Sequence, residues 1–324
     1  MFVGIDHGTT HMRFASTDGR EFKLSRQQAA AMSPEELLTS ILQGLNTSIS
    51  DIKMMAVTYS MGDGINKITP IDRVSDRGIQ SRHGAGLHVG GGTKVYDTIQ
   101  DSGIPAVVIP GLHRGNTSDA RFNVFSHGAS PEKIGIVYHA HKKGHDNLVV
   151  SDISSNTVTL AAAHGQLLGA LDACIFAPGI HHGPIDLEGI RDVDDGKYTA
   201  NEVFTHAGVA KMAGVQDIEA LMAAFLANDP KAILALDTAV LFAAMEITAM
   251  KLLLKEKDIE DPSIFIAGSI SDLKYARDRI EAHVGTGVEC LGVWAGALGC
   301  AGIAQDVYHG ARDIMGIGVD ISNP

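Results

Sequence analysis

The chain has 324 residues, 45% of them hydrophobic, which is enough to build about two globular domains. Its 38 acidic residues outnumber its 26 basic ones, and a formal charge of −12 repels phosphate backbones and anionic lipids, so we expect neither nucleic-acid nor membrane binding. The three cysteines (Cys174, Cys290 and Cys300) lie far apart in the sequence and indicate no disulfide framework, and no signal segment is recognisable, so we expect a cytoplasmic protein.

The first third of the chain predicts strands in a meander, followed by alternating helices and strands. Extended runs at 2–6, 11–16 and 21–24 are separated by turns, the second of them at Asp18-Gly19. Ser33-Pro34-Glu35-Glu36 has the signature of a capped helix start and predicts a helix over 34–46. Further strands are expected at 53–58, 68–71 and 106–109, with a Gly- and His-rich loop at 76–92 and a helix at 93–101.

The strand pattern begins again near residue 148. Extended runs at 147–151, 158–163 and 166–171 alternate with a polar turn and with His164-Gly165, as in the opening module. A repeated module predicts two similar α/β domains, 1–147 and 148–324, that face each other across a cleft. Whether the last helix, 295–308, packs back on the first domain is left open.

The remainder of the chain is mostly helical by its periodicity. Helices are expected at 201–213, 217–228, 231–256 and 271–283, with strands at 263–267 and 287–291. The most apolar stretch, Ile233–Leu254, carries Asp237, Glu246 and Lys251, which a membrane span would be expected to lack. We therefore predict a core helix with one wide apolar face.

Two polar turns have the composition of a phosphate site. In the first, Gly8 permits close approach of the backbone, Thr9 and Thr10 supply hydroxyl groups, and Asp6 supplies a carboxylate suited to hydrated Mg²⁺. Taken alone, such a segment is more often an ordinary polar turn. A second turn of the same composition at the corresponding place in the repeat favours a phosphate site instead.

The second turn offers the same chemistry. Asp152 precedes Ser154, Ser155 and Asn156, so facing hairpins are expected to hold the β- and γ-phosphates of Mg-ATP from two sides. A third segment, the strand ending at Gly268-Ser269, permits adenosine to lie against the backbone.

These three features resemble the superfamily of acetate and sugar kinases, Hsp70 and actin, and within it the acetate and butyrate kinases. The resemblance implies an actin-like ATPase (ribonuclease H-like) fold that binds ATP and Mg²⁺. The similar segments are Asp6-His7-Gly8-Thr9-Thr10-His11-Met12-Arg13-Phe14, Leu112-His113-Arg114 and Gly179-Ile180-His181-His182-Gly183-Pro184-Ile185-Asp186. Arg13 stands where the family has a phosphate-facing lysine.

Two departures from that family affect the expected activity. His181 stands where the family has the arginine that stabilises the transferring phosphoryl group, and Tyr138–His141 stands about where it has the catalytic aspartate. Acetate kinase activity is therefore not expected. The leading hypothesis is phosphoryl transfer to an unknown small molecule, with His113, His139 and His181 on the acceptor side.

Alternatives to a small-molecule kinase stay open. One is an ATP-dependent switch that acts on a protein partner, and another is a catalytically degenerate acetate kinase-like protein. A transition-metal site formed by His139, His141 and His145 together with His181 and His182 is a weaker hypothesis, and His139 and His141 share one face if their stretch is a strand.

The chain also resembles the methanogen family called methanogenesis marker protein twelve. The similarity lies in the length, the segment Gly4–Thr10 and the segment His181-His182-Gly183-Pro184. It implies an archaeal cytoplasmic protein linked to methanogenesis. Kinases of this kind are often dimers, so a homodimer is also left open.

Overall fold

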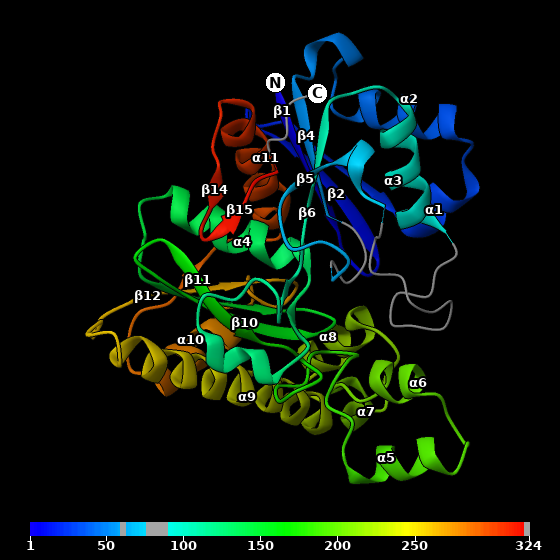
Figure 1. The fold of residues 1–324 in the computed structure, drawn as a ribbon. Coiled ribbons are helices and arrows are strands. Elements are labelled where there is room, and N and C mark those ends of the chain that lie inside the picture. The colour runs from blue at the N-terminus through cyan, green and yellow to red at the C-terminus, as the bar shows by residue number, and fades with distance from the viewer. Residues whose placement is uncertain (59–62, 76–89, 321–324) are drawn as a thin grey trace. The chain divides into compact units, whose positions relative to one another are not determined.

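The computed structural model describes residues 1–58, 63–75 and 90–320, and most of the loop expected at 76–92 lies outside them. The chain divides into two compact units (Figure 1). The first unit contains residues 1–146, 164–169 and 294–324, and the second contains residues 147–163 and 170–293.

The first unit is built on a six-stranded sheet of order β3-β2-β1-β4-β6-β5. Its strands are β1 (Phe2–His7), β2 (His11–Ser16), β3 (Glu21–Ser25), β4 (Met54–Thr58), β5 (Thr69–Pro70) and β6 (Ala106–Ile109). β1, β2 and β3 form an antiparallel meander, and β4 and β6 continue the sheet parallel to β1. The predicted opening meander is confirmed.

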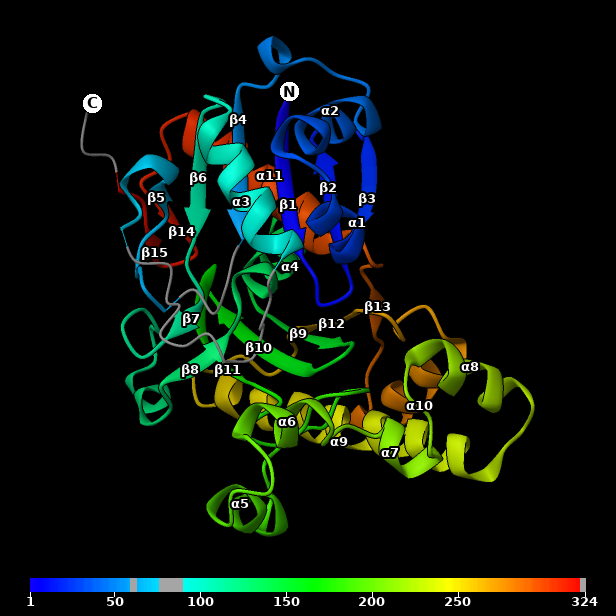
Figure 2. The ribbon, with the colours of Figure 1, turned by 90° about the vertical axis from the view of Figure 1, so that its right-hand side faces the viewer.

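Helices cover both faces of this sheet (Figure 2). Because side chains alternate along a strand, Val3 and Ile5 of β1 join a core with α1 (Arg26–Ala31), α2 (Pro34–Gly44) and α3 (Gly91–Asp101). Gly4, on the opposite face, lies against α11 (Ala295–Tyr308), which also packs on α4 (Pro131–Lys142). The predicted cap of α2 is present, since Ser33 and Glu36 bond to each other's backbone N–H groups.

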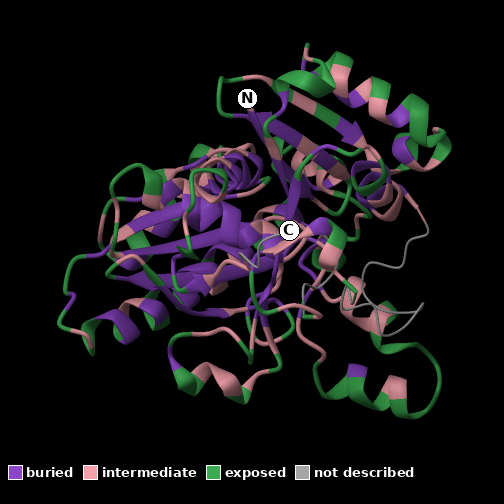
Figure 3. Cartoon of the chain, turned by 45° about the horizontal axis from the view of Figure 1, so that its top comes forward, coloured by how far each residue is buried: buried purple, intermediate pink, exposed green. Residues whose placement is uncertain are grey.

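The second unit repeats this topology. Its sheet has the order β11-β10-β9-β12-β13, which matches β3-β2-β1-β4-β6 strand for strand. The strands are β9 (Leu148–Ile153), β10 (Thr157–Ala163), β11 (Gln166–Leu171), β12 (Ser263–Ala267) and β13 (Glu289–Cys290). β9 and β10 are buried along their whole length, as Figure 3 shows for the sheet interiors. Two duplicated α/β modules are therefore present.

Six helices accompany the second sheet. They are α5 (Leu187–Asp194), α6 (Ala200–Thr205), α7 (Ala210–Ala213), α8 (Ile218–Leu226), α9 (Pro230–Lys255) and α10 (Lys274–Val284). The helix predicted over 201–213 is wrong in part, because the chain leaves the helix between α6 and α7. There Gly208 lies so close to the backbone of His181 that a side chain would not fit.

The predicted helix at 231–256 is confirmed as α9, which packs on β9 and β10. The prediction of a single apolar face is wrong, because Leu234 and Leu241 are 56% and 42% exposed. Among the described residues α9 is also the one helix whose length and composition would allow a membrane span. Half of the most apolar window of α9 is buried inside the protein, so its length and composition are weak evidence for a membrane span.

Shorter elements complete the described chain. They are β7 (Leu112–His113), β8 (His127–Ala129), β14 (Asp313–Ile314), β15 (Ile317–Gly318) and three 3₁₀ helices at 49–51, 71–73 and 120–124. The idea that His139 and His141 share a strand face is wrong. Both lie in α4, where residues two apart point to different sides.

Close contact between α11 and α4 depends on glycine. A side chain at Gly299 would overlap the carbonyl oxygen of Gly135, whereas a side chain at Gly302 would meet only Tyr138 Cε1 at 3.5 Å. We expect Gly299→Ala to lower the free energy of unfolding by about 1–3 kcal/mol through overpacking. Gly302→Ala, in the same helix, should leave it unchanged or raise it by up to about 1 kcal/mol. Urea unfolding followed by circular dichroism measures both, and equal effects would contradict this packing.

Candidate functional site

The β1–β2 turn places exposed hydroxyl groups in front of a buried carboxylate. Thr9 and Thr10 are exposed, and Asp6, at the end of β1, is only 7% exposed. Arg13 lies opposite Asp6 in the strand register, with Nη1 3.6 Å from Asp6 Oδ2. A side chain at Gly8 would approach Arg13 Nη1 to 3.3 Å. The first set of predicted residues is therefore together in one turn.

Residues that the sequence did not single out fix the shape of this turn. Arg26 donates from Nε to the Gly8 carbonyl oxygen (2.9 Å) and from Nη2 to the His7 carbonyl oxygen (3.1 Å). The His7 N–H donates to Thr58 Oγ1, which itself donates to the carbonyl oxygen of Ile5. Burial, assisted by the charge of Arg26, lowers the pKa of His7 to about 3, so its imidazole is neutral at physiological pH.

The carboxylate of Asp6 faces the first turn of α11. A side chain at Gly296 would lie 3.2 Å from Asp6 Oδ2, so glycine lets the carboxylate reach the helix start. The backbone N–H groups there carry partial positive charge and favour a carboxylate. Nearby, burial raises the pKa of the Cys300 thiol, and the charges of Asp6 and Glu132 raise it further, so Cys300 is no nucleophile.

The second hairpin, β9–β10, carries the corresponding group. Asp152 is 3% exposed at the end of β9, and its Oδ1 accepts a 2.7 Å hydrogen bond from Ser154 Oγ. Ser154 Oγ also accepts from the Ser269 N–H at 3.2 Å. Gly268, with φ of +93°, lies where a side chain would overlap both Asp152 Oδ1 and Ser154 Oγ. The structure thus joins the second and third predicted segments into one cluster.

The segment that carries His181 packs on this hairpin and is hydrogen-bonded to it. Gly179 packs directly on the backbone of Asn156. The N–H groups of His181 and His182 both donate to the carbonyl oxygen of Ser155, at 2.9 and 2.8 Å. His181, chosen from its resemblance to a kinase position, therefore lies beside the predicted residues Ser155 and Asn156.

The imidazole of His181 is a weak base in this position. Its partial burial lowers the pKa, and the nearby carboxylates of Asp217 and Glu219 offset only part of that effect. The ring is therefore mostly neutral near pH 7. It can exchange a proton or donate a hydrogen bond, but it does not supply the fixed positive charge of a guanidinium group.

A buried glutamic acid of α9 is hydrogen-bonded to the second hairpin. Glu246 of α9 has Oε2 2.7 Å from Thr159 Oγ1, and Oε1 accepts from the Ala177 N–H at 3.1 Å. Thr159 Oγ1 is also 2.9 Å from Ser151 Oγ. Burial raises the pKa of Glu246 to about 8. The protonated acid can donate to Thr159, which then donates to Ser151, the residue before Asp152.

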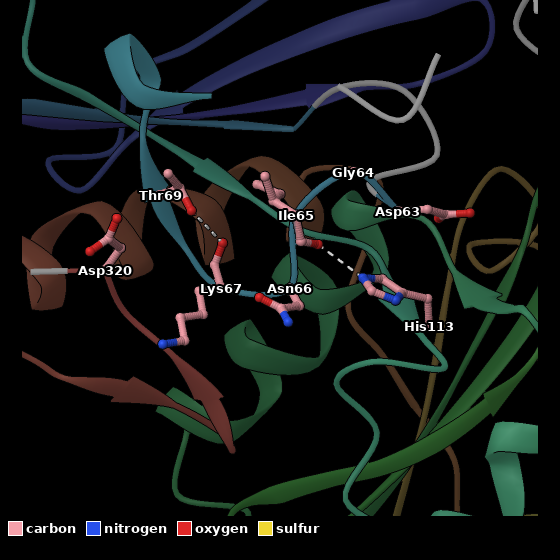
Figure 4. Close-up of a pocket in the computed structure, with 8 residues that line it drawn as sticks. All are labelled: Asp63, Gly64, Ile65, Asn66, Lys67, Thr69, His113 and Asp320. Carbon is pink, nitrogen blue, oxygen red and sulfur yellow. Dashed lines mark hydrogen bonds between the residues drawn. The ribbon is translucent and has the colours of Figure 1, made fainter. Parts of the chain in front are cut away.

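His113 lies elsewhere in the first unit, in the wall of a polar cavity of about 490 Å³ (Figure 4). Its Nε2 is 2.9 Å from the carbonyl oxygen of Ile65, and its Nδ1 accepts from the Gly115 N–H at 3.2 Å. Both ring nitrogens are thus engaged, which fixes the ring and its tautomer. The other lining residues are Asp63, Gly64, Ile65, Asn66, Lys67, Thr69 and Asp320.

His139 lies on α4, half-buried, and burial with the charge of Lys143 lowers its pKa. Within residues 1–58, 63–75 and 90–320, no three His, Cys, Asp or Glu side chains are grouped to hold a metal ion. The transition-metal hypothesis for His139, His141 and His145 with His181 and His182 therefore finds no ligand set there. Mg²⁺ is different, because it often keeps its waters and needs only one or two carboxylates, and each unit has one buried carboxylate beside its turn, Asp6 in the first and Asp152 in the second.

Sequence comparison finds relatives along the whole chain. The "UPF0285 protein" of Methanosarcina mazei is 52% identical over 322 residues, covering 98% of this chain and 99% of the relative. A "UPF0285 protein" of Methanocaldococcus jannaschii is 47% identical over 331 residues, covering 98% of each chain. No protein-family model matches the chain.

Structure comparison identifies the fold. A propionate kinase from Francisella tularensis superposes with a TM-score of 0.65 at 12% identity, and acetate kinase from Porphyromonas gingivalis with 0.62 at 12%; each covers 94% of this chain and 98% of the other. A ROK family glucokinase from Streptomyces griseus, solved with glucose and AMPPNP, covers 94% of this chain and 99% of its own, with a TM-score of 0.51 at 14% identity. The predicted actin-like α/β fold class is confirmed.

The buried acid of α9 gives a test by pH. The pKa of Glu246 is higher in the folded chain than its ordinary value of 4.5, so the folded state binds the extra proton. Its stabilising contribution is complete below pH 4.5 and declines by about 1.4 kcal/mol per pH unit until about pH 8. Glu246→Gln, which mimics the protonated acid, should remove that decline and be more stable than the wild type at pH 8.

Unfolding free energies at several pH values measure the effect as a difference between variant and wild type. The exposed Glu260→Gln is the control and should keep the wild-type slope. If Glu246→Gln also keeps that slope, Glu246 is ionised in the folded protein and its assigned protonation is wrong.

Proposed function

Because this chain belongs to the UPF0285 family and has the fold of the acetate and sugar kinases, we propose that it binds Mg-ATP and transfers a phosphoryl group to a small molecule. One observation carries the proposal. Each of the two repeated modules has, at the same topological position, a buried aspartate behind a hydroxyl-bearing turn. A single turn of this kind is ordinary, whereas the repetition matches a ligand with several phosphates.

In this proposal each hairpin contributes to one nucleotide site. Gly8, Thr9 and Thr10 bind phosphate oxygens through N–H and hydroxyl groups, and Arg13 adds positive charge. Ser154, Ser155 and Asn156 do the same in the second unit, where Gly268 and Ser269 accept the adenosine. Asp6 and Asp152 hold hydrated Mg²⁺. The AMPPNP in the similarly folded Streptomyces griseus glucokinase supports a nucleotide as the ligand.

The acceptor is proposed to be a polar molecule rather than acetate. His181 is mostly neutral, so it lacks the fixed charge expected of an acetate kinase. The cavity beside His113 is lined by Lys67, Asn66 and two aspartates, which suit hydroxyl or amine groups better than a methyl group. His113, His139 and His181 are proposed for the acceptor side, with His113 orienting rather than exchanging protons.

A nucleotide switch is the second candidate, favoured by the neutral imidazole of His181 where a kinase arginine is expected. In that case ATP hydrolysis is slow and responds to a protein partner. For either candidate we propose a cytoplasmic role linked to methanogenesis, and the relatives in Methanosarcina and Methanocaldococcus agree with an archaeal protein.

Calorimetric titration with Mg-AMPPNP tests the shared nucleotide site. Asp6→Asn and Asp152→Asn should each weaken binding by about 10-fold or more, because each removes a charge that holds the cation. The exposed Asp101→Asn and Asp261→Asn are matched controls in the two units and should bind like the wild type. An unchanged affinity in either site variant contradicts a shared role.

Turnover separates the candidates once binding is established. Purified protein is incubated with Mg-ATP and pools of polar small molecules, and ADP release is followed. A rate that rises with one pool indicates a kinase, a rate that rises only with a protein fraction indicates a switch, and binding without ADP release indicates a degenerate enzyme.

A further inference from the structure

An apolar stripe runs along the outer side of α9. The inner side of this helix packs on β9 and β10 (Figures 1 and 2). On the outer side the exposed fractions are 56% for Leu234, 42% for Leu241, 48% for Met245 and 64% for Leu252. Four exposed aliphatic side chains on one side of a helix form an apolar surface, which in soluble proteins commonly marks an interaction site.

The spacing of the stripe is that of a helix–helix seam. With Thr238 and Thr248 the stripe positions follow one another at intervals of four, three, four, three and four residues, so all six lie on one side of the helix. The Thr238 and Thr248 hydroxyls each donate 2.8 Å hydrogen bonds to carbonyl oxygens of their own helix, at Leu234 and Ala244. Their methyl groups are thereby left to pack outward.

The stripe is symmetric in spacing and nearly symmetric in residue type, since its positions match from both ends except that Leu241 corresponds to Met245. Residue 243 is its centre, so an antiparallel copy of α9 places Leu234 opposite Leu252 and Leu241 opposite Met245. Thr238 then lies opposite Thr248. A two-fold interface requires this property, because each residue must fit the residue that it meets on the other copy. We infer that the outer face of α9 is the interface of a homodimer in which the two α9 helices pair antiparallel.

The stripe covers 19 residues from Leu234 to Leu252, or about 27 Å at 1.5 Å per residue. That is a narrow seam, and we therefore expect a reversible dimer.

A lipid surface is the other occupant with suitable chemistry. It is less favoured, because a lipid surface sets no requirement on residue order and does not explain the symmetry of the stripe. The long helix also keeps Glu246 on its inner side, hydrogen-bonded within the protein. A membrane span would have to break those contacts.

The oligomeric state of the full chain tests the inference. Sedimentation equilibrium should give twice the chain mass of 34.2 kDa for the wild type. The double variant Leu241→Glu, Met245→Glu brings four carboxylates together at the two-fold axis and should raise the dissociation constant by about 100-fold or more. Leu226→Glu, on the 74% exposed Leu226 outside the stripe, is the control and should remain dimeric. Unchanged circular dichroism shows that the variants are folded.

Cross-linking tests the antiparallel register. In a Cys174→Ser background, which removes the exposed thiol, Thr238→Cys and Thr248→Cys chains are mixed and oxidised. The mixture should form an interchain disulfide, whereas each variant alone should not, because its two engineered thiols are about 15 Å apart along the pair, beyond disulfide reach.

Three results would overturn the inference. The first is a wild-type monomer at all concentrations tested, and the second is a dimer that the double glutamate variant leaves intact. The third is a monomer that co-sediments with phosphatidylcholine vesicles through the same leucines, which would assign the stripe to a lipid surface.

Discussion

The approach of Gly268 to Asp152 and Ser154 is the contact on which the site of the second unit depends. Because β12 runs parallel to β9, the chain leaves both strands at the same edge, and the positive φ of Gly268 turns it across the hairpin. No side chain fits there, so the backbone itself touches the carboxylate. In the first unit Gly296 of α11 is also close to Asp6, since a side chain there would lie 3.2 Å from Asp6 Oδ2. Both aspartates can therefore be buried while the turns beside them stay accessible.

Much of this arrangement was predictable, because the signals are local. Strand alternation, turn residues and capping boxes depend on neighbours in the sequence, so both hairpins and the helix at Ser33 were found. The position of Asp152 relative to Gly268 was harder to predict from the sequence. It depends on parallel pairing between segments more than 100 residues apart, whereas the local pattern predicts only a strand that ends in glycine.

Other features were not predictable, for physical reasons. α4 is buried on nearly every side, so Ile134, Val137 and Tyr138 show no amphipathic pattern. Arg26 acts through contacts with residues distant in the sequence, and nothing in its own neighbourhood marks it. Glu246 stands out as a charge in an apolar stretch, but its partners Thr159 and Ala177 lie 87 and 69 residues away and could not be predicted. An exposed leucine cannot be distinguished from a buried one by sequence pattern alone, because both contribute equally to an apolar helix face. The outer stripe of α9 was therefore read as part of one buried face.

A crystal structure of the full chain with Mg-AMPPNP tests the central claim most directly, because that claim concerns which backbone groups meet the phosphates. We expect phosphate oxygens within hydrogen-bond distance of the N–H groups of residues 8–10 and 154–156, with the cation between them and the two aspartates. A nucleotide that touches one hairpin only, or that binds away from both, would contradict it.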